Sequence, residues 1–293
     1  MHVSAINIYP IKSLKGIGVD SSVVEERGLR HDRRWLLTDG YGVFLTQRQF
    51  PRMALIEVGV GDDGLYVTAD GFGTMELAFS PDTGNRQQIT IWQSFCDGDV
   101  YSATVNEWFS DVLATGCQLV HMPDDSRRSV NSRFDSGNDV VSFADGYPLM
   151  AISDASLSDL NSRLDAPLPM NRFRPNLVVS GTDAYAEDDW ASIRVGDALF
   201  RTTKPCERCV ITTVDQSTGE FAGKEPLKTL ASYRLAKMVM PERLAPLGIN
   251  ETAVLFGQNL ISESPGTIIT IGDEVTTVVE LKSTPPPSES KPI

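Results

Sequence analysis

Two of the four cysteines stand three residues apart, between basic neighbours and directly before a β-branched run. The segment reads Lys-Pro-Cys-Glu-Arg-Cys from Lys204 to Cys209 and continues Val-Ile-Thr-Thr-Val. Val, Ile and Thr favour strands, so we predict a strand over 210–214, with Cys209 at its start and Cys206 in the preceding loop. Lys204 and Arg208 favour the thiolate, which binds metals and attacks electrophiles. We therefore expect a fold in which the start of this strand, with Cys209, lies at a pocket.

A single Cys-x-x-Cys pair is compatible with several chemistries. Structural zinc usually takes four ligands, whereas Cys96 and Cys117 stand alone and His2, His31 and His121 are scattered. A thioredoxin-like pair usually follows a strand and opens a helix, and here the cysteines precede the predicted strand. Three readings remain open: two ordinary thiols, a thiolate that binds a soft metal, and a thiol that takes part in sulfur transfer.

The cysteine segment resembles the MOSC domain, the C-terminal module of molybdenum cofactor sulfurases. The resemblance rests on Cys206-Glu207-Arg208-Cys209, Thr212-Thr213-Val214-Asp215, Lys224-Glu225-Pro226-Leu227-Lys228-Thr229-Leu230 and Phe256-Gly257-Gln258-Asn259. With its N-terminal half included, the chain resembles two-domain bacterial MOSC reductases related to the mitochondrial amidoxime reducing component.

This resemblance implies an α+β fold that is largely β. An N-terminal β-barrel-like domain (1–118) is expected to precede a MOSC β-barrel domain with flanking helices (119–282). A Pro- and Ser-rich tail (283–293) is expected to be flexible.

The resemblance also implies a molybdenum cofactor, a molybdenum–molybdopterin, and a set of residues that hold it. The second cysteine of the family motif binds molybdenum, which maps the metal ligand and catalytic residue to Cys209. The residues expected to hold the pterin and its phosphate are Lys12, Ser13, Arg33, Gly146, Tyr147, Arg174, Asn176, Arg208 and Asn259. Their types suit this role, because Arg and Lys bind phosphate and glycine lets a backbone approach a ligand closely.

The activity implied by the resemblance is the reduction of N-hydroxylated compounds such as hydroxylamines and amidoximes, a detoxifying reaction. Its expected partners are a small N-hydroxylated substrate and a separate electron-transfer protein, either ferredoxin-like or a flavoprotein reductase. Two alternatives stay open: a sulfur carrier that uses a persulfide on Cys209, and a non-catalytic carrier of the cofactor.

Composition limits the other classes of function. A net charge of −13 argues against generic nucleic-acid binding, which needs an excess of Lys and Arg. The net charge of the whole chain conceals a basic stretch over 9–52, which contains eight basic and five acidic residues. Such a stretch in an acidic chain favours a small anionic ligand. No run is long and apolar enough for a signal peptide or a membrane span, so we expect a cytoplasmic protein that does not bind membranes, with free thiols.

Two helices and one loop complete these expectations. Apolar residues cluster on one side of 105–113, which predicts a helix, and Ser153 is a suitable N-cap for a second helix that ends at Leu164. The polar stretch 124–139 holds Arg127, Arg128 and Arg133. It is read as a loop that either covers an anionic ligand or is simply solvated.

Overall fold

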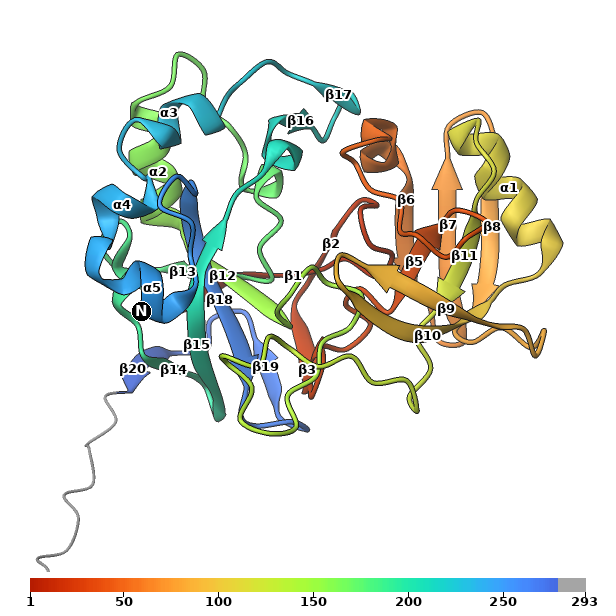
Figure 1. Cartoon of the computed structure of the whole chain (residues 1–293), viewed down its shortest axis with the longest axis horizontal. Helices are drawn as coiled ribbons and strands as arrows, with labels where there is room; N and C mark the ends of the chain where they lie inside the picture. Colours follow the sequence, from red (N-terminus) through yellow and green to blue (C-terminus); the bar gives the residue numbers. More distant parts are fainter. Residues whose placement is uncertain (279–293) are drawn as a thin grey trace, which may run out of the picture.

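The computed structural model describes residues 1–278, and within them the chain forms two lobes that meet along one side (Figure 1). The larger lobe is built on an eight-stranded sheet. Its strands, in spatial order, are β2 (Ile17–Val19), β1 (His2–Ile8), β13 (Leu177–Ser180), β12 (Leu149–Ser153), β18 (Leu255–Ser262), β15 (Ala198–Glu207), β14 (Ser192–Val195) and β20 (Val275–Val278). The smaller lobe carries much of the N-terminal half.

The smaller lobe consists of two sheets and a helix. One sheet has the order β5 (Trp35–Thr38), β11 (Gln118–His121), β10 (Ser94–Val100) and β9 (Arg86–Ile91), and the other has β6 (Glu57–Val60), β7 (Gly64–Ala69) and β8 (Gly73–Ala78). The helix is α1 (Ala103–Leu113), whose buried face packs into the same apolar core as Trp35 and Val67.

Short elements complete the described chain. They are the sheet β19 (Ile268–Thr270), β3 (Ser21–Glu25) and β4 (Gly28–Leu29), the pair β16 (Val214–Asp215) and β17 (Glu220–Phe221), the helices α2 (Asp154–Ser162), α3 (Leu227–Ala231), α4 (Ala236–Val239) and α5 (Leu244–Leu247), and the 3₁₀ turns η1 (Pro51–Leu55), η2 (Met170–Arg172), η3 (Ala186–Asp189), η4 (Val210–Thr213) and η5 (Pro241–Arg243). The fold is thus α+β and largely β, as expected. None of the described helices has the length and apolar character needed to cross a bilayer.

The first strand of the chain lies inside the larger sheet, between β2 and β13. It pairs antiparallel with β13, and its apolar residues Val3 and Ile6 are fully buried in the core that also contains Leu149 and Phe200. This pairing places the loop after β1 where the two lobes meet. The division of the chain at residue 118 stays a prediction.

The strand predicted over 210–214 is wrong, because these residues form η4 and only Val214 enters a strand. The Thr212 and Thr213 hydroxyls donate to the carbonyls of Cys209 and Val210, three residues back, at 2.9 and 2.8 Å. Such local bonds stabilise a tight turn and outweigh the strand preference of β-branched residues.

The position expected for Cys206 is also wrong, since it lies in β15 and not in a loop. Proline cannot donate to a ladder, and the register of β15 against β18 shifts on both sides of Pro205. The bulged strand carries Cys206 to its exposed end, so that Cys209 follows directly as the residue that caps η4.

Both predicted helices are confirmed, as α1 and α2. Ser153 caps α2, because its side chain accepts a hydrogen bond from the amide of Ser156 at 3.0 Å. The predictions for 279–293, including the flexible tail, lie outside the described residues.

Replacing Ser153→Ala should lower the free energy of unfolding by about 1–2 kcal/mol, because it leaves the first turn of α2 without its side-chain acceptor. Chemical denaturation measures this loss. Ser102→Ala is the matched control, since Ser102 precedes α1 without a side-chain cap bond and its loss should cost much less. Equal losses at the two sites would contradict the capping role.

Candidate functional site

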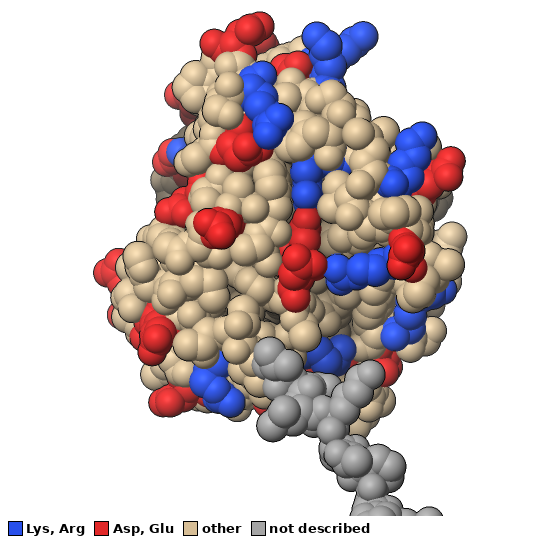
Figure 2. Space-filling view, turned by 90° about the vertical axis from the view of Figure 1, so that its left-hand side faces the viewer, with Lys and Arg blue, Asp and Glu red and all other residues tan. Residues whose placement is uncertain are grey.

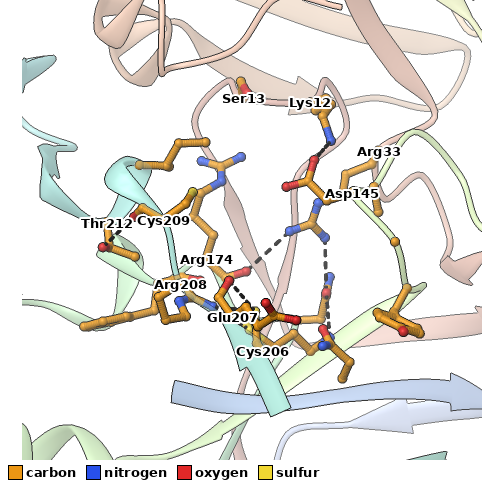
Figure 3. A pocket seen from close by; sticks show the side chains of 18 of the residues that line it. Lys12, Ser13, Arg33, Asp145, Arg174, Cys206, Glu207, Arg208, Cys209 and Thr212 are labelled. Carbon is orange, nitrogen blue, oxygen red and sulfur yellow. Dashed lines mark hydrogen bonds and ion pairs between the residues drawn. The ribbon is translucent and has the colours of Figure 1, made fainter. Parts of the chain in front are cut away.

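A cavity lies where the two lobes meet, and its walls come from both halves of the chain (Figure 3). The smaller lobe and the loop after β1 supply Lys12, Ser13, Arg33, Thr46 and Arg48. The larger lobe supplies Ala144, Asp145, Gly146, Tyr147, Leu149, Met150, Arg172, Phe173, Arg174, Asn176, Cys206, Glu207, Arg208, Cys209, Ile211, Thr212 and Asn259. All ten residues expected to bind the cofactor line this one cavity; their individual roles stay predictions.

The cavity wall is strongly basic. Six of its side chains are Lys or Arg and two are Asp or Glu. The rest of the molecule does not share this bias. On the face shown in Figure 2, basic side chains are interspersed with acidic ones. A concentration of positive charge in a cavity of an otherwise acidic chain selects small anions.

Several guanidinium groups in the wall have buried nitrogens that no described residue accepts from. They are Nη1 of Arg48, Nη1 of Arg172, Nη2 of Arg174 and Nε of Arg208. A buried donor without an acceptor costs free energy, and a phosphate or another oxygen-rich ligand would satisfy it. These residues therefore fit an anionic cofactor.

Arg174 is a largely buried cation without a paired carboxylate among the described residues. Its guanidinium lies 4.2 Å above the ring of Tyr9 and forms no ion pair with a described carboxylate. Burial lowers the pKa of Arg174 to about 10, so the group is still charged at neutral pH. A buried charge of this kind is stabilised by an anion bound beside it.

Three non-glycine residues of the wall adopt left-handed backbone conformations. Ser13, Arg33 and Arg174 have φ values of 68°, 52° and 54°. Such conformations cost free energy and concentrate at ligand sites, where the surrounding structure enforces them. The side chain of Arg33 is held by two hydrogen bonds, because its guanidinium donates to Asp32 at 2.5 Å and to the Asn176 side-chain oxygen at 3.1 Å.

Lys12 and Asp145 form an ion pair at 2.5 Å between the loop after β1 and the segment before β12. Burial lowers the pKa of Lys12 to about 8, although Asp145 opposes this effect. Burial alone would raise the pKa of Asp145, but Lys12 and then Arg48 outweigh it and hold that pKa below its ordinary value. The Lys12 ammonium also donates to the Phe143 carbonyl at 2.8 Å.

The two thiols of the motif meet different guanidinium groups. Arg48 Nη2 lies 3.2 Å from Cys209 Sγ, and Arg208 Nη1 lies 3.0 Å from Cys206 Sγ. Both cysteines are free and partly exposed, whereas Cys96 and Cys117 are buried elsewhere. The cavity thus presents an accessible thiol at Cys209 within a wall that attracts anions.

Sequence reasoning missed several wall residues, chiefly Arg48, Asp145 and Arg172. Arg48 lies in the basic stretch 9–52, Asp145 precedes Gly146, and Arg172 stands two residues before Arg174. Their side-chain roles depend on contacts between the lobes, which no local pattern reveals.

The loop at 124–139 does not line the cavity in this structure, and its covering of a bound ligand stays a prediction. Arg128 is buried and donates to the carbonyls of Ser142, Ala144 and Asp145. Arg133 donates to the carbonyls of Ala245 and Pro246. These arginines tie the loop to the larger lobe, and they do not line the cavity.

Anion binding in the cavity should weaken as the pH rises above about 8. Below that value Lys12 of the ligand-free protein is charged, and above it the amine is neutral and its attraction for an anion is lost. Titration calorimetry with sulfate, whose charge is constant in this range, measures the effect on cofactor-free protein.

Lys12→Met should remove this pH dependence. Lys15→Met is the control, since Lys15 is half exposed and pairs with Glu57 outside the cavity. A Lys12→Met protein that keeps the same decline above pH 8 would show that another group causes it.

Sequence comparisons place both halves of the chain. Residues 1–116 match the model of the MOSC N-terminal beta barrel domain, and residues 138–276 match the model of the MOSC domain. Mitochondrial amidoxime-reducing component 1 of Mus musculus is 38% identical over 283 residues, which cover 93% of this chain and 81% of that protein. The Homo sapiens protein of the same name is 35% identical, with 93% and 82% covered. The molybdenum cofactor sulfurase of Oryza sativa subsp. japonica is 34% identical over 270 residues, 81% of this chain but 31% of that longer protein.

Proposed function

We propose a function from one premise: this chain belongs to the family of two-domain MOSC proteins that includes the mitochondrial amidoxime-reducing components. We propose that it is a molybdenum-cofactor-dependent oxidoreductase that reduces N-hydroxylated compounds such as hydroxylamines and amidoximes. The names of the amidoxime-reducing components that it resembles support the reaction class. The cofactor is supported by the MOSC domain and by the similarity to a molybdenum cofactor sulfurase.

The observation that carries the proposal is the combination of a partly exposed thiol with unsatisfied guanidinium donors in one basic cavity. Molybdopterin has a phosphate that such donors suit, and its metal accepts a thiolate ligand. We assign the metal to Cys209. The pterin and its phosphate are assigned together to Lys12, Ser13, Arg33, Gly146, Tyr147, Arg174, Asn176, Arg208 and Asn259.

The cofactor, when bound, supplies the two-electron redox chemistry, and the protein supplies binding and orientation. Arg33 and Asn176 are already hydrogen bonded to each other, so the donors that remain free keep a fixed direction. The Asn259 side chain donates to the Lys204 carbonyl at 3.0 Å and thereby fixes the strand that leads to the cysteines. Pre-positioned groups of this kind lose little entropy when the ligand binds.

Reduction also needs electrons. We propose that a separate electron-transfer protein, ferredoxin-like or a flavoprotein reductase, delivers them. A cytoplasmic location is part of the same proposal.

A sulfur carrier that holds a persulfide on Cys209 is the second candidate, and the similarity to a molybdenum cofactor sulfurase favours it. Reductant-releasable sulfur on Cys209 of metal-free protein would support this role. A carrier without catalytic activity would instead bind the cofactor and show no turnover with any electron donor.

Cys209→Ala should abolish most molybdenum binding and the reduction of N-hydroxylated substrates, because it removes the proposed metal ligand. Elemental analysis for molybdenum and fluorescence of the released pterin measure binding in protein from cells that make the cofactor. The wild-type protein should carry metal and pterin in roughly equal amounts.

Two control variants locate the effect. Cys96→Ala removes a buried thiol away from the cavity and should retain the metal. Cys206→Ala tests the choice between the two motif cysteines, and it should retain most of the metal. Full metal content and turnover in Cys209→Ala would refute the ligand assignment, and an absence of both metal and pterin from all variants would favour sulfur transfer.

A further inference from the structure

Arg48 is the residue of the smaller lobe that reaches the sulfur of Cys209. Its Nη2 lies 3.2 Å from Sγ, within hydrogen-bonding distance for a sulfur acceptor. The two residues are 161 positions apart in the sequence, and they face each other across the line where the lobes meet. The thiol therefore has a donor that its own lobe does not supply.

The side chain of Arg48 is held on two sides. Its guanidinium carbon lies 4.7 Å from the centre of the Trp92 ring, a cation–π arrangement, and its Nη2 lies 3.6 Å from Asp145 Oδ2. Trp92 itself donates from its indole nitrogen to Asp145 Oδ1 at 3.3 Å. Arg48 thus has a fixed direction, set by a ring and a carboxylate.

The position of Trp92 is itself a constrained feature. It stands in the turn between β9 and β10 with φ of 55°, a left-handed conformation that is unfavourable for a large side chain. The ring is about half exposed, and it lies in an edge-to-face arrangement with the buried ring of Phe44, with the ring centroids 5.1 Å apart. The two-residue turn of the hairpin requires this conformation, and the turn places the ring over Arg48.

The backbone of Arg48 is fixed as well. Its amide donates to the Thr46 hydroxyl at 3.2 Å. The neighbouring Gln47 is fully buried, donates to the Ser13 carbonyl at 2.7 Å and exchanges amide hydrogen bonds with Gln216 of the larger lobe at 3.3 and 3.0 Å. The loop is thus anchored to both lobes, as a precise site requires.

We propose that Arg48 is a positioning residue for Cys209: its hydrogen bond across the two lobes orients the sulfur for the bound cofactor. The inference rests on the proposed function, since it takes Cys209 as the metal ligand. Groups that hydrogen bond to a metal ligand fix its orientation, and their loss typically costs about 10- to 100-fold in metal affinity or activity. Arg48 acts through the sulfur and needs no contact with the substrate.

The test is Arg48→Met, which keeps a long side chain near Trp92 and removes the donors. Molybdenum should leave this variant about 10- to 100-fold faster than the wild type during dialysis, followed as the ratio of metal to protein. Turnover should show a lower kcat with little change in KM for the N-hydroxylated substrate. Arg48→Lys keeps one donor and the charge, and it should recover part of both losses.

Arg86→Met is the matched control. Arg86 is exposed, pairs with Asp99 and Asp125 on the surface, and lies outside the cavity. Its metal retention and kcat should equal those of the wild type. Thermal unfolding of the cofactor-free variants shows whether each one is folded.

Trp92→Leu tests the positioning of Cys209 by Arg48 while leaving the guanidinium of Arg48 in place. It removes the ring that directs Arg48, so it should speed metal loss in the same direction by a smaller factor. If Arg48→Met does not fold, this variant decides, and normal metal retention in it would overturn the proposal.

The outcomes separate this inference from the proposed function. If Cys209→Ala loses the metal while folded Arg48→Met holds it as firmly as the wild type, the positioning role of Arg48 is wrong and the ligand assignment stands. If Cys209→Ala also keeps the metal, the ligand assignment fails, and the role of Arg48 fails with it.

Discussion

The antiparallel pairing of β1 with β13 is the contact on which the cavity depends. It places the first strand of the chain inside a sheet made mostly of C-terminal strands, with Ile6 opposite Leu177. The residues that follow each strand or precede it, Lys12 on one side and Asn176 on the other, are thereby brought to one wall. This pairing, together with the contact of Arg48 with Cys209, brings the basic stretch at the start of the chain to the cysteine motif.

The basic wall of the cavity is electrostatically unfavourable in the ligand-free protein. Six cationic side chains in one cavity repel each other, and burial lowers the pKa values of Lys12 and Arg174. Asp145 offsets part of this charge through Lys12 and Arg48, whereas Arg174 lies over the ring of Tyr9 and pairs with no carboxylate within residues 1–278. The remaining positive charge is an unfavourable term in the ligand-free protein that an anion converts into binding free energy.

The sequence was most informative where a family pattern and a residue's chemistry coincide. Lys12, Arg33 and Arg174 were named because basic residues at those places resemble phosphate contacts, and all three line the cavity. The helix capped by Ser153 was found from purely local signals. The prediction of a strand at 210–214 was wrong because the hydroxyls of Thr212 and Thr213 donate to carbonyls three residues earlier and stabilise a turn. Strand propensities do not take such local hydrogen bonds into account. Arg48 was overlooked because its importance arises from a partner 161 positions away.

The place of β1 in the sheet also bears on how the protein is made. The strand β1 has a local partner on one side, since β2 follows it within the first 19 residues. On the other side, Ser4 donates its hydroxyl proton to the carbonyl of Val178, 174 residues later, so this edge of β1 stays unpaired until β13 has been synthesised. Contacts of such long sequence separation slow folding, because the closure of a large loop precedes any gain from pairing. The two family domains are consequently linked in assembly, and a fragment that begins after β1 would expose β13 as an open sheet edge.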